Sequence, residues 1–453
     1  MDMPSEPMLP IVAMFFLLLV QLGLARRTLP AQSLLLGAQA IFWFLAFVLR
    51  PLYFVVYQPT TTPELADPRL MWTQYSDALS EVMWLCVAGQ AVFVVTAFFI
   101  YKVSGASGKR ARDGLTPPLR YDWDPTVAGI ATVLWLIGWV GRIAMSVGIQ
   151  SLDSAFKIFG TVGGALLIVS YRGKSKRLTV AILCALILIE EVWAFSFASK
   201  AALVVPLLAL ALRWMLTERP GVIGRRVTAL GLTALVGFLV IQPLHGVNTA
   251  QTVSASNTDE FAEVKGSAIS VLERFDGLSA VTDAVFMGPA TWMTLDQFLH
   301  RVLVNAVPTG PIEAKSASTG QQWTREVRAE SNPNQYLDVS LAAGPTAEGY
   351  ALAGMLGVAF ENALLAAATM AAGSGIHSRR PHFVVFASTF AFSTILFEQG
   401  LFGLSATTNK ALQLTICAYL LAVILRSSRT RDELQPPEKR RENLNSSHVR
   451  GPN

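Results

Sequence analysis

Residues 8–24 read MLPIVAMFFLLLVQLGL, a run without a charged side chain, and Arg26 and Arg27 follow it closely. A run of this length crosses a hydrocarbon core of about 30 Å as an α-helix. Similar runs recur along the chain, in which 52% of the residues are hydrophobic and only 15% are charged. That balance excludes an ordinary soluble domain. It predicts an all-α, polytopic membrane protein.

We expect a bundle of about eleven transmembrane helices, one for each long apolar run. The runs are residues 8–24, 31–49, 82–101, 127–147, 156–170, 178–197, 201–216, 227–241, 346–370, 383–397 and 412–425. Residues 1–426 would form one integral membrane domain. Residues 427–453 are polar and basic, and we predict that they form a disordered cytoplasmic tail.

Basic clusters follow every second run, which is the pattern of cytoplasmic loops. They lie at residues 26–27, 102–120, 172–177, 219–226, 379–380 and 426–441. This pattern places the N-terminus outside, the C-terminus in the cytoplasm, and the long segment 243–345 outside. Because these clusters border lipid, the net charge of +5 indicates contact with the bilayer and not with nucleic acid.

The external loop, residues 243–345, is the largest part of the chain that is not built for lipid. In residues 260–286 and 291–307, apolar side chains recur every three or four positions. Both stretches are therefore expected to be amphipathic helices that lie on the bundle or the outer leaflet. Residues 308–345 are rich in Gly, Pro and Ser and should be irregular.

The next apolar run begins with Gly344-Pro345-Thr346-Ala347-Glu348, which resembles a helix start with proline in the first turn. Glu348 would then lie at the outer membrane boundary. Gly349, Ala353 and Gly357 recur every four residues, which predicts a ridge for close packing against another span.

Cations in the external loop and at the outer ends of spans are candidates for binding an anionic substrate. Snorkelling to the interface or a solvated helix face is the alternative for each of them. The candidates are Arg142, Lys200, Arg274, Arg301, Lys315 and Arg325. Glu348, Asp276 and His300 are the candidate proton acceptors for a hydroxyl group. No metal-ligand spacing or cofactor motif is present, so we predict neither a metal nor a cofactor.

Five short segments follow a recognisable set of motifs: residues 199–203 (SKAAL), 274–278 (RFDGL), 305–315 (NAVPTGPIEAK), 345–350 (PTAEGY) and 354–357 (GMLG). These segments resemble bacterial polysaccharide polymerases of the Wzy type. The last three follow that family's motif order, and Tyr350 falls on a motif position. Thr309 stands where the family often has arginine, so either Arg301 or Arg325 would take over that anion contact or the phosphate site would be arranged differently. Ala353 stands where an aromatic residue is common.

The resemblance implies that the protein polymerises undecaprenyl-pyrophosphate-linked oligosaccharide repeat units at the outer face of the bacterial cytoplasmic membrane. The expected chemistry is glycosyl transfer without a metal. A chain-length regulator and a flippase would be its partners. An O-antigen ligase has the same architecture and stays open as an alternative, and a polysaccharide flippase or transporter is a third possibility.

Overall fold

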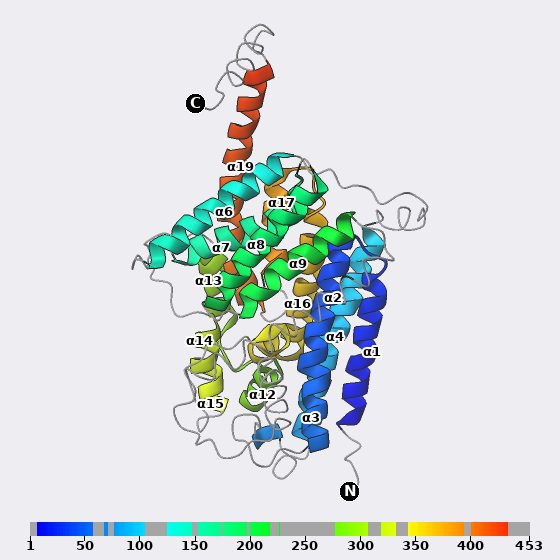
Figure 1. Ribbon diagram of the computed structural model, residues 1–453. Coiled ribbons are helices and arrows are strands. Elements are labelled where there is room, and N and C mark those ends of the chain that lie inside the picture. The colour runs from blue at the N-terminus through cyan, green and yellow to red at the C-terminus, as the bar shows by residue number, and fades with distance from the viewer. Residues whose placement is uncertain are drawn as a thin grey trace, which may run out of the picture.

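The computed structural model describes residues 7–57, 68–70, 77–104, 125–146, 153–173, 175–196, 200–217, 226, 277–306, 319–331, 343–393 and 400–433. All regular secondary structure in these ranges is helical (Figure 1). The expectation of an all-α membrane protein is confirmed for the class of fold, but not for the number of spans.

The first helices form an antiparallel group at one side of the bundle (Figure 1). They are α1 (Met8–Ala25), α2 (Pro30–Phe44), the π-helical segment η1 (Leu45–Leu49), α3 (Arg50–Tyr57) and α4 (Ala78–Val103). Three buried glutamines, Gln21, Gln39 and Gln90, join these helices. Gln90 donates to the side chain of Gln21 at 2.7 Å, and Gln21 donates to the carbonyl of Leu36 at 2.8 Å. Such polar contacts between apolar helices fix their register.

The second group contains α6 (Pro125–Ser146), α7 (Asp153–Ser170), α8 (Lys176–Ser196) and α9 (Lys200–Thr217). Helices α6 and α7 approach closely because glycines line their contact. A Cβ atom on Gly163 would stand 2.9 Å from the Cα atom of Trp135. The small residues therefore determine which faces of α6 and α7 meet.

The segment predicted to be the external loop is described in two pieces. The first contains α12 (Gly277–Met287) and α13 (Leu295–Ala306); the second contains α14 (Thr319–Trp323), η4 (Thr324–Arg328) and α15 (Ala329–Ser331). Two expectations need correction. Helix α12 is buried continuously from Leu278 to Ala284 and has no solvent face there. Residues 319–331 are helical, although their composition predicted irregular structure.

The last helices are α16 (Gly344–Gly375), α17 (Pro381–Ala391) and α19 (Leu401–Glu433). Helix α16 starts where the sequence predicts, with Pro345 in its first turn. Helix α19 continues to Glu433, into the segment predicted to be a disordered tail. Residues 434–453 lie outside the described ranges.

Helix α16 is broken into two halves. Ala353 (φ −148°, ψ 23°) and Gly354 (φ 59°, ψ −141°) leave the helical region, and only glycine adopts the second of these conformations without strain. The halves fold against each other, so that a Cβ on Gly349 would stand 2.7 Å from the backbone nitrogen of Val358. The sequence predicted that Gly349 and Gly357 pack against another span. This prediction is wrong, because the two glycines pack against each other.

Six of the described helices are long and apolar enough to cross a membrane: Met8–Ala25, Pro30–Val56, Ala78–Val103, Pro125–Ile143, Gly344–Gly375 and Leu401–Ser427. Each predicted run except 227–241, which lies outside the described ranges, overlaps a helix. The number of about eleven spans stays a prediction. The first turn of α1 lies at the same end of the molecule as α12, α14 and α15, and the last turns of α19 project from the opposite end (Figure 1).

Candidate functional site

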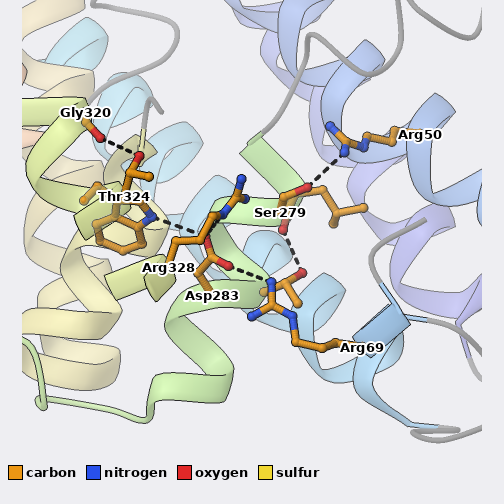
Figure 2. Close-up of polar contacts among 10 residues, drawn as sticks. Arg50, Arg69, Ser279, Asp283, Gly320, Thr324 and Arg328 are labelled. Atoms are coloured by element: carbon orange, nitrogen blue, oxygen red, sulfur yellow. Dashed lines mark hydrogen bonds and ion pairs between the residues drawn. The ribbon is translucent and has the colours of Figure 1, made fainter. Parts of the chain in front are cut away.

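A polar cluster is built around Asp283 of α12, whose side chain is fully buried. Arg69, in the short helix η2 (Pro68–Leu70), binds one carboxylate oxygen at 2.6 Å, and Arg328 of η4 binds the other at 2.9 Å. Figure 2 shows Asp283 between the two arginines. Residues far apart in the sequence thus meet at the end of the bundle that contains the first turn of α1.

The charge of Asp283 depends on these partners. Burial raises the pKa of the Asp283 carboxyl above its ordinary value, and the positive charges of Arg328 and Arg69 act in the opposite direction. Loss of either arginine would raise this pKa further. The ion pairs are therefore needed to hold a charged group in this position.

The cluster extends to further segments of the chain. Arg50, the first residue of α3, donates to the hydroxyl of Ser279 at 2.9 Å, and both side chains belong to buried residues (Figure 2). The indole nitrogen of Trp323 donates to Asp283 at 3.4 Å. The cluster thus ties α3, η2 and η4 to α12.

Four aromatic side chains connect this cluster to α19. Trp292 contacts Trp323 and Phe402, with ring centroids 5.1 and 5.5 Å apart, and Phe298 contacts Phe402 at 4.9 Å. We call Trp292, Phe298, Trp323 and Phe402 the aromatic cluster. Its edge-to-face contacts are the arrangement that aromatic pairs prefer.

The predicted anion-binding residue Arg301 lies at the edge of the aromatic cluster. It pairs with Glu326 at 3.1 Å, and both side chains are a little more than one-third exposed. Glu326 also accepts a hydrogen bond from the indole nitrogen of Trp292 at 2.8 Å. Arg325, in the same π-helical segment as Glu326, is exposed. Both predicted cations are thus near the Asp283 cluster and reachable from solvent.

Glu348 belongs to the first half of α16 and lies next to Phe402, a member of the aromatic cluster. It is only 3% exposed, and its Oε1 accepts a hydrogen bond from the backbone nitrogen of Phe402 at 2.9 Å. Gly400 leaves room for the carboxyl group, because a Cβ there would stand 2.8 Å from its Oε2. Glu348 is therefore bound to the backbone of α19 inside the protein and does not lie at an open surface.

The connection between α12 and α13 fixes the end of the first half of α16. The backbone nitrogens of Ala290 and Trp292 donate to the carbonyls of Tyr350 and Ala351, at 3.2 and 3.0 Å. Tyr350 itself is partly buried. These bonds satisfy carbonyl groups that the break in the helix would otherwise leave without partners.

The structure does not place the remaining predicted residues at the Asp283 cluster or the aromatic cluster. His300 is exposed and lies two residues from the buried Phe298, so it points to the opposite side of α13. Lys200 is the first residue of α9, and its side chain is outside the described part. Arg274, Asp276 and Lys315 also fall outside the described residues.

Arg142 belongs to a separate buried cluster. Its guanidinium group contacts both carboxylate oxygens of Glu190, at 3.1 and 3.0 Å, and lies 5.1 Å from the ring centres of Trp139 and Trp193. Trp135 also donates to Glu190, at 2.8 Å. Arg142 thus joins α6 to α8, because its charge is paired with Glu190 and its guanidinium group contacts two indole rings. This geometry gives it a structural role here, in place of the predicted contact with substrate.

Sequence reasoning missed Arg50, Arg69 and Asp283. A usable signal was present for Asp283, because a charged residue in the otherwise apolar stretch GLSAVTDAVFM needs a partner once it is buried. Nothing local identifies Arg69 as that partner. In the described ranges, no group of three or more His, Cys, Asp or Glu side chains is arranged to hold a metal ion.

Comparisons with protein-family models, curated proteins and solved structures find no match for this chain.

Proposed function

We propose that this protein is a membrane glycosyltransferase that polymerises undecaprenyl-pyrophosphate-linked repeat units at the outer face of the bacterial cytoplasmic membrane. The observation that carries the proposal is the gathering of Arg50, Arg69, Arg301, Arg325 and Arg328 at one end of an apolar helical bundle. Guanidinium groups bind phosphate oxygens in pairs, and a lipid pyrophosphate would present its charge at this level of a membrane.

In this proposal the arginines have two roles. Arg69 and Arg328 hold α12 and η4 in place through Asp283, while Arg301 and Arg325 are accessible and bind the pyrophosphate. The bond between the sugar and the pyrophosphate breaks as the acceptor hydroxyl attacks, and the negative charge that grows on the leaving group is stabilised by fixed cations. Arg301 exchanges its contact with Glu326 for one with phosphate.

The acceptor hydroxyl must lose a proton in this reaction. Glu348 is our first candidate to receive it or to orient the hydroxyl, because its carboxylate is fixed next to the aromatic cluster. Since Glu348 is buried, the acceptor reaches it only when the residues packed around it move apart. His300 and Asp276 are the alternatives, and the exposed position of His300 on the far side of α13 makes it the weaker of these.

Deletion of the gene tests the proposal directly. Cells without the protein should accumulate a single lipid-linked repeat unit on the outer face of the membrane. Accumulation of complete polymer that is not transferred to an acceptor would indicate a ligase. Repeat units retained on the cytoplasmic face would indicate a transporter.

Removing the exposed cations should abolish polymer. We expect Arg301→Ala and Arg325→Ala each to lower the rate about 10²- to 10³-fold, which is the effect of deleting one transition-state donor. Arg301→Lys should recover little, because it cannot make the paired contact. The rate is measured with purified protein and lipid-linked repeat units. Arg379→Ala, an exposed cation next to α17, is the control and should be unaffected. Normal rates from both site variants would remove these arginines from the mechanism.

Glu348→Gln should lower the rate at least about 10²-fold, since general acid–base catalysis contributes that much or more. The glutamine carbonyl can still accept the bond from Phe402, so the fold should survive. The assay is the same, with protein amount and elution volume checked by gel filtration. Glu330→Gln, an exposed carboxylate of α15, is the control. Polymer of normal length at a normal rate would leave Glu348 with a purely structural role.

A second candidate function, transport, is favoured by the break in α16. Discontinuous helices with polar groups at the break are common in secondary transporters. Glu348 and Glu361 stand on the two halves of such a helix, and both are buried. The deletion experiment above separates this function from polymerisation.

A further inference from the structure

Glu348 and Glu361 are brought together by the break in α16. Glu348 precedes Gly354 and Glu361 follows it, and their exposed fractions are 3% and 2%. The two carboxyl groups are neighbours, because a Cβ atom on Gly400 would stand less than 3 Å from atoms of both. In an unbroken helix, residues thirteen positions apart would be separated by about 20 Å along the axis. The pair therefore exists only because the helix folds back.

The first residues of α19 bind both carboxyl groups. The backbone nitrogen of Phe402 donates to Oε1 of Glu348 at 2.9 Å, and that of Leu401 donates to Oε2 of Glu361 at 3.2 Å. Amide groups in the first turn of a helix have no partner within the helix and favour negative charge. Gly400 completes the site, because any side chain there would collide with both carboxyl groups.

One oxygen in this site has no donor. Oε1 of Glu361 is buried, and as a carboxylate oxygen it has no hydrogen-bond partner. Buried polar atoms are normally paired. Two carboxylates in contact cannot both carry a charge in a buried site, whereas a proton on one of them supplies the missing donor.

We propose that Glu348 and Glu361 form a proton-binding site, in which one proton is shared between the two carboxyl groups where α16 meets α19. The pair then carries a single negative charge, which the two backbone donors of α19 stabilise. This proposal does not depend on which molecule the protein acts on.

Other titratable side chains on the helices packed against α16 are placed elsewhere. On α4, Glu81 and Lys102 lie in the first and last turns. On α12, Asp283 is bound to Arg69 and Arg328. The others with described side chains are Cys86 and Tyr101 on α4, His382 on α17, and Lys410, Cys417, Tyr419 and Arg426 on α19. The hydrogen bonds to the carboxyl pair come from the backbone of Leu401 and Phe402, so the proton belongs to Glu348 and Glu361.

Infrared spectroscopy of the purified protein in lipid tests the proposal without any substrate. At neutral pH the wild type should show the carbonyl band of a protonated carboxyl group, and the band should shift in deuterium oxide. Glu361→Gln should shift or remove this band, because it takes away one of the two carboxyl groups that share the proton. Glu348→Gln is the second variant, and the amide band of each variant reports whether it is folded.

Glu326→Gln and Glu330→Gln are the controls. The first removes a carboxylate that is a little more than one-third exposed, and the second removes an exposed one on α15. Both should keep the wild-type band unchanged. Alkaline titration of the wild type should remove the band and lower the melting temperature, because the second charge repels the first; Glu361→Gln should show a smaller fall. A wild-type spectrum without the band, or a band unchanged in both pair variants, would overturn the proposal, whatever the outcome of the polymer assay.

Discussion

Asp283→Asn should destabilise the protein by about 3–5 kcal/mol, the effect of removing one member of a buried ion pair. Asparagine has nearly the same shape and can keep the bond from Trp323. It leaves Arg69 and Arg328 buried without their shared negative partner, however. Because these residues join η2, α12 and η4, we expect this end of the bundle to open first. The measurement is the free energy of unfolding in detergent by denaturant titration.

Glu326→Gln is the matched control for this change. Glu326 also pairs with an arginine and also accepts a bond from an indole nitrogen, but its pair is more than one-third exposed. Exposed pairs contribute only about 0–1 kcal/mol. Equal effects from the two variants would show that burial of the Asp283 cluster is not what stabilises it.

Gly357→Ala should prevent α16 from folding back on itself. A Cβ on Gly357 would stand 2.7 Å from the carbonyl carbon of Gly349, and both atoms belong to backbone that cannot rotate away. We expect a loss of at least about 3 kcal/mol, the upper end of the usual cost of overpacking. Glu348 and Glu361 would be separated as the two halves move apart.

Folded yield and melting temperature of Gly357→Ala measure this effect. Gly37→Ala is the control, since a Cβ on Gly37 of α2 meets nothing within 4 Å. Replacing a glycine inside a helix by alanine there should be neutral or stabilising by up to about 1 kcal/mol. A stable Gly357→Ala protein that keeps the infrared band of the carboxyl pair would contradict the folded-back geometry.

Much of the helical architecture could be predicted because its cause is local. The apolar runs specify helices because backbone groups in lipid must bond within their own segment. Pro345 marks the start of α16 by its fixed φ angle and its missing N–H. On α13 the sequence spacing separates the side that carries Asp296 and His300 from an apolar side, but Leu295, Leu299 and Leu303 of the apolar side are exposed as well and only Phe298 is buried.

The site could be predicted only in part. Arg301 and Arg325 are candidates because cations are scarce in an apolar chain, and Glu348 is a candidate because it follows a helix start; their roles stay predictions. Arg142 has the same signal, yet it is paired with Glu190. A charged residue in an apolar run indicates that it needs a partner of opposite charge. It does not indicate which residue that partner is.

The sequence by itself determined that the chain is helical, that it is built for a membrane, and where most helices begin. The tertiary structure decided that Asp283 meets Arg69 and Arg328, that α16 breaks at Gly354, and that Glu348 meets Glu361. The physical reason is the separation in sequence of the residues that interact. Helix formation depends on neighbours within about four residues, whereas these contacts join segments that only packing brings together. The free-energy cost of one unpaired buried charge exceeds the local conformational preferences that its pairing overrides.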